Sequence, residues 1–153
     1  STMIWVWVIV AVVAFIITRW TVFGRNVYTI GSNKEAARLS GISVGRTTIG
    51  VYALCALFSG IAGIMFTSRI ANGVPTAGQG YELDAIAAAV IGGASLSGAE
   101  GSVPGTVIGA IIMQLLRNGG NLLGINPFIL EIVIGSLIVV TVLLDQRNKS
   151  QKV

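Results

Sequence analysis

The sequence predicts an all-α membrane protein, a bundle of about five transmembrane or partly spanning helices that includes short or broken ones. Hydrophobic residues make up 54% of the 153 residues and charged residues only 10%, whereas a soluble domain carries about a quarter charged residues. The mean hydropathy of +0.84 agrees with this reading. Helices are expected because a bilayer cannot satisfy the backbone groups of an open sheet edge.

Three apolar runs are predicted to cross the membrane, since a spanning helix needs about 20 apolar residues. Residues 3–23 contain Arg19 as their one charge, and residues 47–68 contain none. Residues 127–144 form the last run, which has one acid, Glu131, near its start. We expect Glu131 to reach the membrane interface.

The basic residues indicate the orientation of these spans. Eight of the ten Lys and Arg residues lie within residues 19–46 and 147–152. The positive-inside rule places the loop 24–46 and the tail 145–153 in the cytoplasm. The second span then ends outside and the last span begins there, so the stretch between them must enter the membrane and return.

That stretch, residues 85–116, is too long for one spanning helix and too short for two. We expect two short segments, 85–99 and 102–116, that meet near residues 97–101. Interrupted helices are tolerated at membrane depth only where protein or a water-filled cavity surrounds them. Glycines recur every fourth residue at Gly101, Gly105 and Gly109, and we expect them to pack helices within one subunit rather than form a specific dimer motif.

The first of these short segments is predicted to begin at Asp84, as an N-cap, and to stop at Gly92 and Gly93. Such a helix must be held by protein or border a pathway through the membrane. The candidate pathway or gate residues are Asp84, Ala88, Gly92 and Gly93. Tight packing without contact to a substrate is the alternative.

The loop between the first two spans contains a short polar helix. Residues Lys34–Leu39 are helix formers, Asn33 can cap their start, and Gly41 can end the helix with a positive φ. The pattern favours a docking surface for a soluble partner, and a solvated connector is the alternative.

The side chains of this short helix suit a protein contact. Glu35 and Arg38 are three residues apart and can pair with each other or with charges on a partner. Ala36 and Ala37 give a low face that the groove of another protein can cover.

No catalytic arrangement is evident. The sequence has no histidine, no P-loop for ATP and a single cysteine, Cys55, so no catalytic residue, metal site or cofactor is expected. The net charge of +4 comes from few ions, which disfavours nucleic acid, and residues 1–3 lack the basic region of a signal peptide. No acid lies in mid-membrane, which argues for an external energy source, although a secondary transporter or channel driven by an ion gradient remains the alternative.

Four segments resemble one family, the bacterial ribose-type (monosaccharide) ABC transporter permeases. They are residues 24–42, around GRNVYTIGSN and EAARLSGI; residues 75–88, PTAGQGYELDAIAA; residues 92–98, GGASLSG; and residues 118–124, NGGNLLG. Family members run to about twice this length, so residues 1–153 resemble the C-terminal half of one permease domain.

The resemblance implies a multi-pass permease subunit of an ATP-driven importer of a ribose-like sugar in the bacterial cytoplasmic (inner) membrane. Its partners would be a cytoplasmic ABC ATPase, a periplasmic sugar-binding protein, a second permease copy and the lipid bilayer. The permease would catalyse no reaction itself, because ATP hydrolysis belongs to the ATPase. The residues implied to couple it to that ATPase are Asn33, Glu35, Ala36, Ala37, Arg38 and Gly41.

Overall fold

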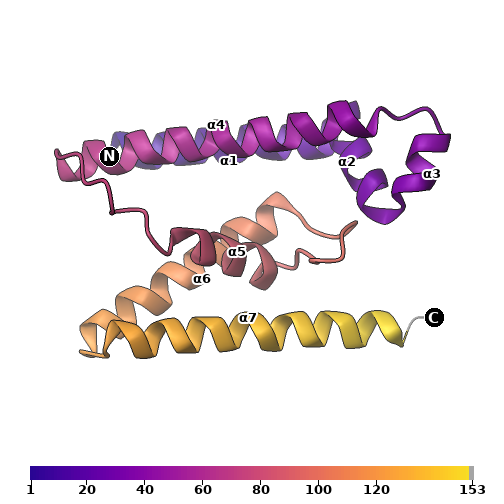
Figure 1. Ribbon diagram of the computed structural model, residues 1–153. Coiled ribbons are helices and arrows are strands. Elements are labelled where there is room, and N and C mark those ends of the chain that lie inside the picture. Colours follow the sequence, from indigo (N-terminus) through magenta and orange to yellow (C-terminus); the bar gives the residue numbers. More distant parts are fainter. Residues whose placement is uncertain (152–153) are drawn as a thin grey trace. The chain divides into compact units, whose positions relative to one another are not determined.

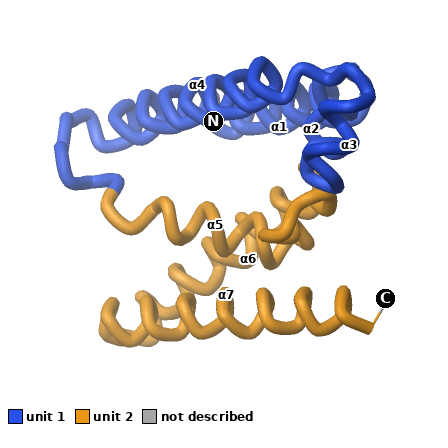
Figure 2. The backbone as a smooth tube through the Cα atoms, turned by 45° about the vertical axis from the view of Figure 1, so that its right-hand side comes forward, with its two compact units in different colours: residues 1–78 blue, residues 79–153 orange. Residues whose placement is uncertain are grey.

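The computed structural model describes residues 1–151, and all regular structure in that range is helical (Figure 1). The prediction of an all-α protein is therefore confirmed. The chain divides into two compact units, residues 1–78 and residues 79–153 (Figure 2). Within the described range, α1, α4 and α7 are long and apolar enough to cross a membrane.

The first unit contains four helices. They are α1 (Thr2–Trp20), α2 (Val22–Ser32), α3 (Lys34–Leu39) and α4 (Val44–Ile70). The predicted span 47–68 lies inside α4, which extends it at both ends. The predicted span 3–23 runs three residues past the end of α1 at Trp20, and the predicted loop 24–46 is mostly helical.

The chain changes direction at Thr21 for a local reason. Thr21 has an extended backbone, and its side chain accepts a hydrogen bond from the Gly24 backbone N–H at 3.2 Å, which caps α2. Gly24 is buried, and a Cβ there would collide with the carbonyl oxygens of Ile17 and Thr18. The threonine and the glycine together end α1 and start α2 without an unstructured loop.

The second unit contains three helices. They are α5 (Tyr81–Ile91), α6 (Val103–Leu122) and α7 (Pro127–Ser150). The predicted interruption near residues 97–101 is confirmed, because residues 92–102 form no helix. The predicted stop at Gly92 and Gly93 is confirmed as well, because α5 ends at Ile91 with Gly92 as its C-cap, so the rest of the segment 85–99 is not helical. The segment 102–116 differs from the prediction, because its helix continues to Leu122.

The remaining corrections concern the end of the chain. The sequence NGGN at residues 118–121 is typical of a turn, but all four residues belong to α6, and the turn comes later at Gly124, which has a φ of +70°. The predicted tail 145–153 is helical up to Ser150. Residues 152–153 of that tail lie outside the described range. Polar composition alone does not end a helix whose backbone hydrogen bonds remain intact.

α5 and α6 pack with their backbones in direct contact. A Cβ on Gly105 would collide with the carbonyl oxygen of Gly92, and a Cβ on Gly109 would collide with that of Ala88. Helices approach this closely only where small residues face each other. Packing within one subunit, as predicted for this glycine series, is confirmed for Gly105 and Gly109.

An apolar cluster surrounds this contact. It contains Ala87 and Ala88 of α5, Met113 of α6, and Leu130 and Ile134 of α7. α5 has only 11 residues, a length of about 16 Å at 1.5 Å per residue, or roughly half of the hydrocarbon core. Its neighbours α6 and α7 therefore hold it in place.

The backbone contact makes a direct prediction about Gly109. The substitution Gly109→Ala places a methyl group against the Ala88 carbonyl and forces the helices apart, which we expect to cost about 1–3 kcal/mol of stability. Gly119→Ala in the same helix is the matched control, since a Cβ there meets nothing within 4 Å. Thermal unfolding of the detergent-purified protein measures both, and equal melting temperatures for the two variants would contradict the contact.

Candidate functional site

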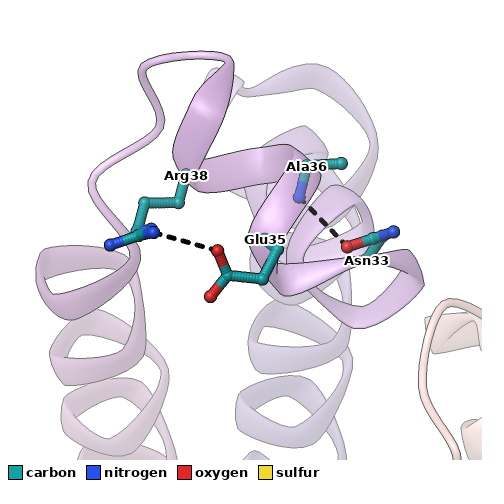
Figure 3. A network of polar contacts seen from close by, with 4 residues as sticks. All are labelled: Asn33, Glu35, Ala36 and Arg38. Atoms are coloured by element: carbon teal, nitrogen blue, oxygen red, sulfur yellow. Dashed lines mark hydrogen bonds and ion pairs between the residues drawn. The ribbon is translucent and has the colours of Figure 1, made fainter.

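The start of α3 is fixed by the residue predicted to cap it. Asn33 has an extended backbone, with φ −153° and ψ 107°, and its Oδ1 accepts a hydrogen bond from the Ala36 N–H at 3.0 Å (Figure 3). This contact satisfies one of the N–H groups that a helix leaves free at its N-terminus. The prediction of an Asn33 cap is confirmed.

The end of α3 is fixed by Gly41, which has a φ of +87° as predicted. The Gly41 N–H donates to the Arg38 carbonyl at 3.1 Å, and the Ile42 N–H donates to the Ala37 carbonyl at 3.1 Å. This pair of bonds is the Schellman arrangement, in which a left-handed residue satisfies the last carbonyls of a helix. A helix of six residues is thus held at both ends by its own chain.

The side chains of α3 divide into one that faces inward and several that face outward. Ala37 is fully buried, so it anchors α3 to its own unit and does not offer a surface to a partner. Ala36, Glu35 and Arg38 are exposed, as their predicted role requires. Leu39, which the sequence analysis did not single out, is 81% exposed. The sequence signal for an exposed contact residue at this position is a leucine within an otherwise polar helix.

Glu35 and Arg38 form the predicted ion pair. Arg38 Nη2 donates to Glu35 Oε2 at 3.0 Å (Figure 3). The side chain of Arg38 is 68% exposed and that of Glu35 is 70% exposed. An ion pair this exposed contributes little to stability. Both charges therefore remain available to a partner.

α3 is joined closely to the long helix α4. Ser43 is the N-cap of α4, and the buried Thr47 hydroxyl donates to the Ser43 carbonyl at 3.0 Å. The ring of Phe23 in α2 lies over Gly50 of α4, where a Cβ would come within 2.6 Å of Phe23 Cε2. Only residues 40–43 separate α3 from α4, so the two helices are close neighbours along the chain.

The second set of predicted residues lies in the other unit. Ala88 is 6% exposed and lies against Gly109, while Gly92 lies against Gly105. Gly93 is exposed and has a φ of +99°. Ala88 and Gly92 thus form part of the contact between α5 and α6, and a role for them at a transport pathway remains a proposal.

Asp84 does not cap α5, which is a correction to the prediction. The N-cap is Gly80, and Asp84 lies in the first turn, where it pairs with Arg117 of α6. Arg117 Nη2 donates to Asp84 Oδ1 at 2.6 Å, and Arg117 Nε lies 2.6 Å from Asp84 Oδ2. The planar guanidinium engages both carboxylate oxygens and ties the start of α5 to the last turns of α6.

The contact between Asp84 and Arg117 should contribute to the stability of the second unit. Arg117→Met removes both contacts and leaves the Asp84 carboxylate, which is 19% exposed, without its cation, so we expect a loss of about 1–3 kcal/mol. Arg69→Met, at the exposed end of α4, is the control. The double swap Asp84→Arg with Arg117→Asp should recover part of the melting temperature that Arg117→Met loses. No recovery would mean that the attraction between the two charges does not stabilise the protein.

Comparison with known proteins places the chain in a family. A family model described as "Branched-chain amino acid transport system / permease component" matches residues 1–142. The chain belongs to this family. No solved structure is significantly similar to it.

Curated relatives include several sugar permeases. The chain is 47% identical to the ribose import permease protein RbsC of Escherichia coli strain K12 over 148 residues, which cover 97% of this chain and 46% of that protein. It is 46% identical over 143 residues to RbsC of Bacillus subtilis, covering 94% of this chain and 44% of that protein. The xylose transport system permease protein XylH of Haemophilus influenzae is 46% identical over 143 residues, covering 94% and 38%. The chain thus spans about half the length of the curated relatives it matches.

Proposed function

We propose that this chain is the C-terminal half of the permease subunit of an ATP-driven importer for a ribose-like monosaccharide. The proposal rests mainly on α3, a short exposed helix that is capped at both ends and is followed directly by a helix long and apolar enough to span a membrane. The chain's similarity to permeases named for ribose and xylose supports a sugar as the transported substrate.

In this proposal the membrane protein lies in the bacterial cytoplasmic membrane and performs no covalent chemistry. A separate cytoplasmic ATPase binds the outward face of α3, which consists of Glu35, Arg38 and Leu39. A periplasmic sugar-binding protein delivers the sugar, and a second permease copy completes the pathway. ATP-driven motion of the ATPase moves α3, and α3 moves α4.

The first test concerns the end of the coupling helix. Gly41→Val forces a β-branched residue into a left-handed conformation, which should disorder the end of α3 although a Cβ there meets nothing within 4 Å. We expect normal membrane insertion but a loss of about tenfold in ATP-dependent sugar uptake by the assembled transporter in proteoliposomes, since positional strain of this kind costs about 1–3 kcal/mol.

Gly45→Ala is the matched control for that variant. Gly45 lies in the first turn of α4, also has open space around it, and has no left-handed backbone. Normal coupling in both variants would remove α3 from the coupling path. Uptake that continues without the ATPase and collapses when an ionophore is added would instead indicate a carrier driven by an ion gradient.

The second test concerns orientation. The proposal places α3 and the end of α7 in the cytoplasm, as the clustered Lys and Arg residues require. Single cysteines at the exposed positions Ser40 and Ser150, each in a Cys55→Ala background, should react with a membrane-impermeant maleimide only after the cells are opened. Labelling of either site in intact cells would reverse the orientation.

A further inference from the structure

The segment between α5 and α6 has a defined conformation of its own. The Ser95 N–H donates to the Glu100 carbonyl at 3.0 Å, and the Gly98 N–H donates to the Ser95 carbonyl at 3.2 Å. Left-handed backbone at Gly93 and at Gly101, with φ of +99° and +150°, brackets the segment. We call residues 94–101 the 94–101 loop. It is a closed loop with a glycine at each end where the backbone can turn.

Two charged residues near the end of α7 hold this loop. Lys149 Nζ donates to Ser95 Oγ and to Ser97 Oγ, both at 2.7 Å, and Ser95 Oγ donates to Asp145 Oδ2 at 2.7 Å. Asp145 and Lys149 are four residues apart and therefore lie on one face of α7. These four side chains, which join parts of the chain about fifty residues apart, are here called the α7 clasp.

The α7 clasp fastens the part of α7 that the apolar cluster does not include. The residues of α7 in or against that cluster are Leu130, Ile134 and Ile138, all in the first half of the helix. Further along, Val139, Val140, Leu143 and Leu144 are between 53% and 59% exposed. The first half of α7 is thus fixed by burial, and its last turns are joined to the 94–101 loop by polar contacts.

The two kinds of attachment differ in how readily they separate. Opening the contact at Gly105 and Gly109 would expose backbone that is closely packed in the interior. In the clasp, Ser95, Asp145 and Lys149 are partly exposed and Ser97 is exposed, so water can replace each partner. The clasp is therefore a contact that a small change in free energy makes or breaks.

We propose that Asp145 and Lys149 are positioning residues for transport. They hold the 94–101 loop on the last turns of α7 in the resting state and release it during each cycle. With the proposed orientation, this contact lies at the cytoplasmic end of the second unit, where release would separate the last turns of α7 from the 94–101 loop and open an exit. The inference rests on the proposed function, because it assigns the clasp a step in that transport cycle.

A reversible cross-link tests the release. Leu96→Cys and Asn148→Cys, both at exposed positions next to the clasp, leave all four of its side chains in place in a Cys55→Ala background. A flexible bis-methanethiosulfonate reagent can bridge the two thiols. In the assembled transporter we expect an intramolecular cross-link, detected by mass spectrometry after proteolysis. Uptake should fall by at least about tenfold, because the covalent bridge keeps the loop on α7, and it should return after reduction.

Three results would have different meanings. Undiminished uptake in the fully cross-linked protein would show that the clasp does not open during transport. Reaction of each cysteine singly without any cross-link would show that the loop does not lie on α7. Absence of ATP-dependent uptake before cross-linking would contradict the proposed function instead, and the cross-link itself would still report whether the loop is docked.

Side-chain substitutions separate positioning from a structural role. Lys149→Met should lower the sugar transported per ATP hydrolysed by about tenfold, the factor expected for loss of a hydrogen bond from a charged group, while the folded amount stays constant. Lys149→Arg keeps a donor for both serines and should retain most of the coupling. Arg147→Met, at an exposed basic residue two positions away, is the matched control. Equal coupling in the Lys149→Met and Arg147→Met variants would overturn the proposal.

Discussion

The second unit depends on the direct contact between the backbones of α5 and α6. α5 is too short to cross the hydrocarbon core, so its end groups must be satisfied by protein rather than by lipid. Its last carbonyls, those of Ala88, Ala89 and Val90, accept hydrogen bonds from the N–H groups of residues 92–94. The glycines at positions 92, 105 and 109 bring the backbone of α6 against it. Because α5 is held so closely, its alanines can fill an interior that would otherwise need larger side chains, and Leu130 and Ile134 of α7 complete that interior.

The first unit stabilises its short helices in a different way. Along the chain, α2 and α3 lie between two long apolar helices, and their ends are satisfied by local hydrogen bonds from Thr21, Asn33 and the residues around Gly41. Such caps act over only a few residues, so they define the shape of α3 without burying much surface. The helix can remain exposed and still be rigid, and this combination is what a contact with a moving partner needs.

The features of the site that could be predicted from the sequence are those formed by near neighbours. The Asn33 cap, the left-handed Gly41 and the pair of Glu35 with Arg38 each involve residues within three to five positions, where helix geometry determines which groups meet. The pair of Asp84 with Arg117 joins residues 33 positions apart, and the contact of Lys149 with Ser95 spans 54. No local periodicity encodes such distances. Helix bounds failed for a related reason, since polar or glycine-rich composition at residues 24–32 and 118–121 suggested a loop where backbone bonding continues.

The complete burial of Ala37 has a mechanical consequence for α3. A helix of six residues can easily rotate about its own axis, and the methyl group of Ala37, fitted against the rest of the unit, prevents that rotation. The outer face of α3 is therefore fixed relative to the helices beside it. A larger side chain at this position would displace α3 from its neighbours, so a single methyl group sets the direction in which Leu39 and the charged pair face.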